Sequence, residues 1–118
     1  MPLPSEVKTW DDSIDPYDLR PFAIDLTGFL NVGESVASYT LTLLAESVLA
    51  GLEFGVGLYA TDINAGIITF WPTINVSMQE DIQFYGSGVK LPMVLNFSTD
   101  SSPPRRLQRT YAIQVKQR

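Results

Sequence analysis

The sequence predicts an all-β protein, an antiparallel immunoglobulin-like β-sandwich with an extended N-terminal arm. From residue 22 onwards the hydrophobic period is two, which is typical of half-buried strands, and clusters of Gly, Pro, Asn and Ser separate the short runs. A chain of 118 residues suffices for one domain with a single core. We therefore predict an arm over residues 1–21 and a sandwich domain over residues 22–118.

The arm is predicted from its prolines. Four prolines within residues 1–21 preclude a regular helix or a central strand, and no hydrophobic period is sustained there. We expect the arm to lie extended on another subunit, because a donated arm gains interface area without a core of its own. Trp10 lies in this polar segment, and we predict that it anchors in a pocket of a neighbouring subunit.

The first strands of the domain are predicted over residues 22–26 and 35–43. Phe22, Ile24 and Leu26 alternate with Ala and Asp, and turn residues between 28 and 34 end this strand. The second strand has an apolar face and a face rich in hydroxyl groups. Its apolar face is formed by Ala37, Tyr39, Leu41 and Leu43. Residues 44–57 mix helix-tolerant residues with glycines, and we expect an irregular crossover there.

The remaining strands lie in the second half of the chain. Residues 66–78 keep an even hydrophobic register that Pro72 interrupts, which indicates an edge or bulged strand. Residues 89–98 and 107–116 then predict a β-hairpin with one apolar and one polar face. The inward side chains of this hairpin are Val89, Leu91, Met93, Leu95, Phe97, Leu107, Tyr111, Ile113 and Val115.

The composition narrows the range of chemistry. The chain has no cysteine and no histidine, which excludes disulfides and thiolate chemistry and removes the usual general base and the commonest metal ligand. Acids cluster in the arm, but a proline-rich segment offers no rigid shell for paired carboxylates, and their spacing is not that of a calcium loop. We therefore expect no enzyme activity, no cofactor and no metal.

Charge and hydropathy also limit the partners. The net charge of −5 argues against capture of nucleic acid, and the apolar-rich residues 41–60 are interrupted by polar and charged residues, so they fall short of a membrane span. Charged residues make up only 18% of the chain, against about 25% in ordinary soluble domains. This deficit indicates an extensive interface or a polar face built from Ser, Thr, Asn and Gln.

The charges are unevenly distributed along the chain. Residues 1–25 carry six acids against two cations, whereas residues 101–118 carry five cations and no acid. Two solvated segments that merely differ in sign are one interpretation, and a contact between the two ends, within or between subunits, is the other. The candidate partner-binding residues are Trp10, Asp11, Asp12, Asp15, Arg105, Arg106 and Arg109, with Asp18 as a further acidic partner.

The order of these motifs resembles that of the fiber-tail adaptor proteins of tailed bacteriophages. Residues 22–40 resemble the opening of that family, in which an aromatic and an Asp-containing strand precede a leucine, a Gly-acid turn and a Ser/Thr-rich strand. Residues 84–88 resemble its aromatic-Ser-Gly-Gly turn, and residues 105–115 resemble its closing hairpin strand. Two positions depart from the pattern, since Leu26 replaces a frequent tryptophan and Pro103-Pro104-Arg105 replaces a Gly-Arg turn.

The resemblance implies a non-enzymatic structural protein of the virion that joins tail or neck components to fibers. Its partners would be portal, neck, tail or fiber subunits and copies of itself, and it would assemble in the host bacterial cytoplasm. A capsid decoration protein, which repeats over capsid axes, is one alternative. A carbohydrate-binding β-sandwich module is another, and its aromatic platform would draw on Trp10, Tyr17, Trp71 and Tyr85.

Overall fold

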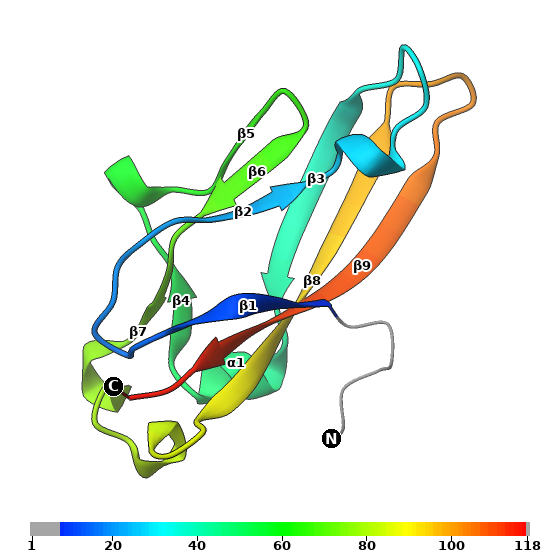
Figure 1. The fold of residues 1–118 in the computed structure, drawn as a ribbon. Helices are drawn as coiled ribbons and strands as arrows, with labels where there is room; N and C mark the ends of the chain where they lie inside the picture. The colour runs from blue at the N-terminus through cyan, green and yellow to red at the C-terminus, as the bar shows by residue number, and fades with distance from the viewer. Residues whose placement is uncertain (1–7, 118) are drawn as a thin grey trace.

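The computed structural model describes residues 8–117, except for the side chain of Asp11, and confirms the predicted all-β sandwich (Figure 1). The strands are β1 (Lys8–Ile14), β2 (Phe22–Asp25), β3 (Val36–Leu43), β4 (Leu52–Phe54), β5 (Asp62–Asn64), β6 (Ile67–Phe70), β7 (Pro72–Ile74), β8 (Val89–Thr99) and β9 (Arg106–Val115). The short helix α1 spans Ala45–Leu49, and 3-10 turns span Thr27–Phe29, Gly57–Tyr59, Val76–Met78 and Ile82–Phe84.

The strands form two layers. One layer is a four-stranded sheet in the order β1-β9-β8-β3. The other contains a three-stranded sheet, β2-β6-β5, and a two-stranded sheet, β4-β7, which a single residue of the chain connects between β6 and β7. In Figure 1 the long strands β3, β8 and β9 face β2, β5 and β6. The side chains between the layers make the core.

The core confirms the period-two pattern in β2 and, except at Pro92 and Ala112, which are buried on the opposite face, in the β8–β9 hairpin. Phe22 and Ile24 are buried while Ala23 and Asp25 are exposed. In the hairpin, the antiparallel register runs from Val89 opposite Val115 to Ser98 opposite Arg106. The buried hairpin residues of the apolar face are Leu91, Met93, Leu95, Phe97, Tyr111, Ile113 and Val115. Each such side chain contributes about 1.5–3 kcal/mol through its removal from water.

Strand β3 differs from its predicted pattern at its start. The register with β8 shifts between Val36 and Ser38, so Val36 packs against the core and Ala37 is exposed. From Tyr39 to Leu43 the predicted alternation holds, with half-buried apolar side chains and exposed threonines. A bulge of this kind moves one residue to the other face of the strand. The alternation of apolar and polar residues along one strand does not reveal such a bulge.

Residues 44–57 contain more regular structure than expected, because α1 and β4 lie within them. The hydroxyl of the buried Ser47 donates to the carbonyl oxygen of Pro92 at 2.7 Å, which fixes α1 against β8. Pro72 is the first residue of β7 and pairs with Phe54 in the two-stranded sheet, so it lies on an edge strand as predicted. The single strand predicted over residues 66–78 is wrong, because the chain divides into β6, the central strand of its sheet, and β7. The even hydrophobic register of residues 66–78 ends before Val76, which lies in a 3-10 turn and is exposed.

The expected arm is wrong from residue 8 onwards. Residues Lys8–Ile14 form β1, which runs parallel to β9 of the same chain, with Lys8 opposite Tyr111 and Ile14 opposite Val115 (Figure 1). Ile14 is fully buried, so β1 adds to the core of its own chain and does not need a partner subunit to bury this side chain. None of the four prolines that argued against a strand lies within β1, since Pro2 and Pro4 precede it and Pro16 and Pro21 follow it. Residues 1–7 lie outside the described part of the chain.

Candidate interaction surface

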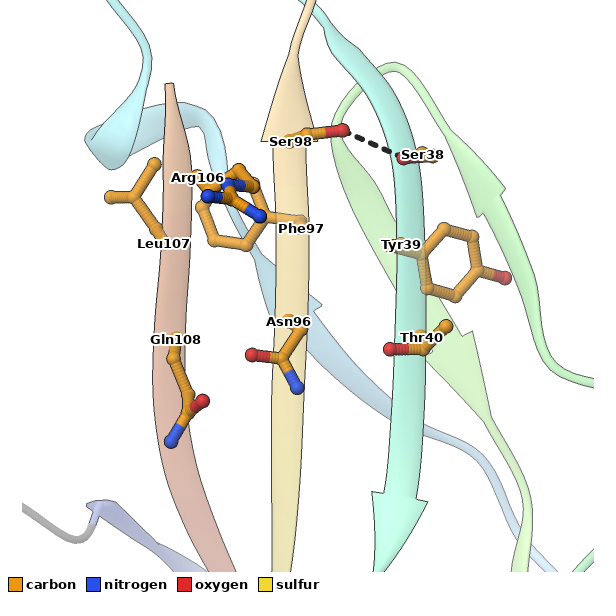
Figure 2. Close-up of a pocket in the computed structure, with 9 residues that line it drawn as sticks. All are labelled: Ser38, Tyr39, Thr40, Asn96, Phe97, Ser98, Arg106, Leu107 and Gln108. Carbon is orange, nitrogen blue, oxygen red and sulfur yellow. Dashed lines mark hydrogen bonds between the residues drawn. The ribbon is translucent and has the colours of Figure 1, made fainter. Parts of the chain in front are cut away.

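The face of β3, β8 and β9 that points away from the core presents polar side chains in rows across the strands. Each row follows the register of the sheet, so its members are direct neighbours. Figure 2 shows the hydrogen bond between Ser38 and Ser98, whose Oγ atoms are 2.6 Å apart. We call this surface the outer polar face. Its residues are Ser38, Ser98 and Arg106 in one row and Thr40, Asn96 and Gln108 in the next.

A hollow of about 720 Å³ lies over the outer polar face. The residues that alternate with the polar rows, Tyr39, Phe97 and Leu107, complete its lining. Among the lining residues only Arg106 carries a charge. Apart from Phe97 and Leu107, the others offer hydroxyl and amide groups that donate and accept hydrogen bonds. The hollow is therefore suited to binding polar groups of a partner by hydrogen bonds.

Arg105, a predicted site residue, is bound by Glu34. Its Nε donates to Oε2 of Glu34 at 3.0 Å, and its second nitrogen donates to Oε1 and to the carbonyl oxygen of Phe29, the latter at 2.8 Å. The Glu34 side chain is 2% exposed and also accepts the backbone N–H of Asn31 at 2.9 Å. Because Arg105 and Asn31 donate to it, the pKa of Glu34 lies well below its usual range.

The other two arginines of the predicted site have different surroundings. Arg109 stands opposite Leu95 in the hairpin, and its guanidinium lies 4.9 Å from the centre of the Phe29 ring. Arg106 is exposed in the outer polar face. The hairpin end thus divides its cations: Arg105 forms an ion pair, Arg109 covers an aromatic ring, and Arg106 faces solvent.

Two acids of the expected arm, Asp12 and Asp18, lie beside Arg20 rather than beside the hairpin arginines. The guanidinium of Arg20 lies 2.8 Å from a carboxylate oxygen of Asp12 and 3.7 Å from one of Asp18. It also donates to the carbonyl oxygen of Ser13 at 2.6 Å, and the Asp15 carboxylate accepts the backbone N–H of Tyr17. Among the described side chains of one chain, Arg105 pairs with Glu34 and not with Asp12, Asp15 or Asp18 as predicted, whereas the side chain of Asp11 lies outside the described part of the structure. Pairing between copies stays a prediction.

Trp10 anchors its own chain. Its ring lies 5.7 Å from Phe22, 5.4 Å from Phe70 and 5.5 Å from Tyr111, measured between ring centres. Its indole N–H donates to the carbonyl oxygen of Ala23 at 3.2 Å. These contacts join β1 to both layers of the sandwich. The predicted insertion of Trp10 into a neighbouring subunit is thus wrong for the described structure.

The aromatic residues do not support a single platform for sugars. Trp71 is half-buried and packs edge-on against Tyr59, with 4.9 Å between ring centres. Tyr17 and Tyr85 are exposed, and the Tyr17 hydroxyl is hydrogen-bonded to Glu80. Since Trp10 packs against the core, a carbohydrate site would have to rest mainly on the two exposed tyrosines.

Two further kinds of site are absent from the described residues 8–117. The acidic side chains described there form no group of three or more that could hold a metal ion. No helix of this region has the length and hydropathy needed to cross a membrane.

Comparisons with protein-family models, with curated proteins and with solved structures gave no match. The resemblance to fiber-tail adaptor proteins therefore stays a prediction from the motifs. Arg106 is the predicted site residue that lies in the outer polar face, whose other residues the sequence indicated only as part of a polar face. Its signal is the alternation of hydroxyl and amide residues in three strands. The Glu34 partner of Arg105 has no local signal, since 71 positions separate the two residues.

Proposed function

We propose that this chain is a non-enzymatic structural protein of a bacteriophage particle, which joins tail or neck components to fibers. The order of the sequence motifs supports the assignment to a bacteriophage particle. The outer polar face supports a contact with another virion protein. This face is the observation that carries the proposal: three hydrogen-bonded strands hold short polar side chains around a hollow of about 720 Å³.

The chemistry of the face suits a permanent joint. Ser, Thr and Asn side chains lose little conformational entropy when they bind, and strands fixed in a sheet keep them in position. Only Arg106 is charged in the lining, so the contact relies on hydrogen bonds and close packing more than on long-range attraction. We expect binding to the neighbouring virion protein to depend weakly on ionic strength.

The test uses particles of the bacteriophage that encodes the chain. Antibody labelling in the electron microscope should place the protein at the tail or neck, and mass spectrometry should give a low copy number set by the tail axis. Label spread over the capsid in many copies would instead make it a decoration protein. Its absence from purified particles would overturn the proposal.

A variant of the face links the location to the surface. Asn96→Lys with Gln108→Lys places two charges in the hollow, at exposed positions whose side chains the core does not use. We expect particles complemented with this variant to lack the protein or the fibers. Lys90→Gln, which also changes an exposed residue of β8 but lies outside the hollow, serves as the control and should be incorporated normally. Normal incorporation of both variants would show that the face is not the joint.

A further inference from the structure

Most exposed edges of the two layers carry features that discourage another strand from pairing. The β1 edge has the charged Lys8 and Asp12 and a register shift in its middle. In the second layer, β2 and β5 are only 4 and 3 residues long, and each carries an exposed acid, Asp25 or Asp62. Short strands, charges and bulges are the usual means by which proteins protect sheet edges.

The edge formed by β3 lacks these features from Ser38 to Leu43. This stretch has no charged residue and no proline, and its register with β8 is regular, because the shift is confined to Val36–Ser38. Within residues 8–117, β3 pairs only with β8, so the backbone groups along its far edge have no strand partner. A regular, neutral edge of this length is a template for a further strand.

We propose that a second copy of this chain pairs with this edge, so that two β3 strands run antiparallel about a two-fold axis. The two sheets would join into one, in the order β1-β9-β8-β3 followed by the partner's strands in reverse. The registers with the largest overlap of Ser38–Leu43 centre on Thr40 or on Leu41. The outer polar faces of the two copies would then lie on the same side of the joined sheet.

The strand is self-complementary in this arrangement. Side chains that oppose one another across an antiparallel pair lie on the same face. With the axis at Thr40, Thr40 meets Thr40 and Ser38 meets Thr42 of the other copy on the outer face. With the axis at Leu41, Thr40 meets Thr42, and Ser38 lies opposite Leu44, beyond the end of β3. The half-buried Tyr39 and Leu41 meet apolar residues on the inner face. The Ser38–Ser98 hydrogen bond between β3 and β8 shows that the same kind of hydroxyl pair forms within the chain.

The charge of the chain also favours this strand for self-association. Two copies that each carry a net charge of −5 repel one another, and a contact along neutral strands keeps like charges out of the interface. If β3 paired with a strand of a different protein, its own sequence would not need to be self-complementary, so the self-complementarity of β3 favours a second copy as the partner. This inference does not depend on the virion role, because it concerns the isolated protein.

The experiment compares the native chain with Thr40→Lys, Thr42→Lys by light scattering after size-exclusion chromatography. Both threonines are exposed, so the folded monomer tolerates the change. In either register a lysine faces a lysine of the other copy, which opposes pairing. We expect the native chain to be a dimer and the double variant a monomer with an unchanged circular dichroism spectrum.

The matched control is Val76→Lys, Ile82→Lys, which adds the same charge at exposed positions of two 3-10 turns outside β3 and outside the outer polar face. It should remain a dimer, so that charge alone does not explain the loss. A native chain that stays monomeric as its concentration rises overturns the inference. A double variant of β3 that remains a dimer also overturns the inference.

A second measurement fixes the register. Because the chain has no cysteine, a single introduced thiol can form a disulfide only between copies. Thr40→Cys should cross-link under mild oxidation if the axis passes at Thr40, and Leu41→Cys if it passes at Leu41, since opposed residues lie within disulfide range. Gln108→Cys, two strands away, should not. A dimer in which neither β3 variant cross-links would show that β3 is not the contact.

Discussion

The β8–β9 hairpin and the segment from β1 to Arg20 lie side by side in the fold but are held by different means. The hairpin is local and antiparallel, and its strands bury a continuous row of apolar side chains. The strand β1 pairs in parallel with β9, about a hundred residues away, and depends on Trp10, Ile14 and the ion pairs of Arg20. The comparison teaches that the hairpin is stabilised by apolar contacts between its own two strands. The β1 segment is stabilised by contacts that exist only after the sandwich has formed.

The largest expected effect is in the hairpin. Ile113 is fully buried opposite Leu91, so Ile113→Ala removes apolar contacts and leaves a cavity. We expect the free energy of unfolding to fall by about 2–5 kcal/mol, measured by chemical denaturation. Gln114→Ala, on the other side of the same strand, should cost much less. Equal losses in the two variants would contradict the strand register.

Trp10→Ala should have a smaller and more local effect. Trp10 is only partly buried, but it touches both layers, so its loss should cost about 1–3 kcal/mol. Hydrogen exchange should show lost protection in β1 and retained protection in the hairpin, because local segments can open without global unfolding. Trp10→Phe keeps the ring contacts but not the hydrogen bond to Ala23, and should recover most of the protection. Uniform loss over the whole domain would mean that β1 is not a separate unit.

The buried ion pair at the hairpin end predicts a pH dependence. The folded pKa of Glu34 lies below its unfolded value, so its stabilising contribution is present above the ordinary glutamate pKa of about 4.3 and is lost as the pH falls below it. Denaturation curves across this range should show a steeper loss for the native chain than for Glu34→Gln. Parallel profiles would contradict the role of Arg105 in lowering this pKa.

The exposed ion pairs of Arg20 should give the smallest effect. The side chains of Arg20 and Asp12 are 36% and 60% exposed, so water screens their attraction. We expect Arg20→Gln to cost about 0.2–1 kcal/mol and the difference to shrink as salt is added. The matched comparison is Asp12→Asn, which should lose a similar amount. A loss that is large and independent of salt would show that Arg20 acts through its contact with the Phe22 ring instead.

The sequence by itself determined the elements whose signals are local. Alternation of apolar and polar residues predicted β2 and both strands of the hairpin, because successive side chains in a strand point to opposite faces. The same alternation predicted the hydroxyl-rich face of β3. Pro72 marked an edge strand because proline has no N–H to donate to a sheet.

Only the tertiary structure decided the features that join distant segments. A parallel strand such as β1 has no partner until β9 is in place. Polar residues separate its two apolar contact residues, Trp10 and Ile14, so the segment shows no hydrophobic period. The bulge at Val36 and the partner of Arg105 likewise depend on the sheet register and on a loop brought in from elsewhere. Local patterns fix which face of a strand is apolar, but the free energy that pairs strands comes from contacts between residues far apart in the chain.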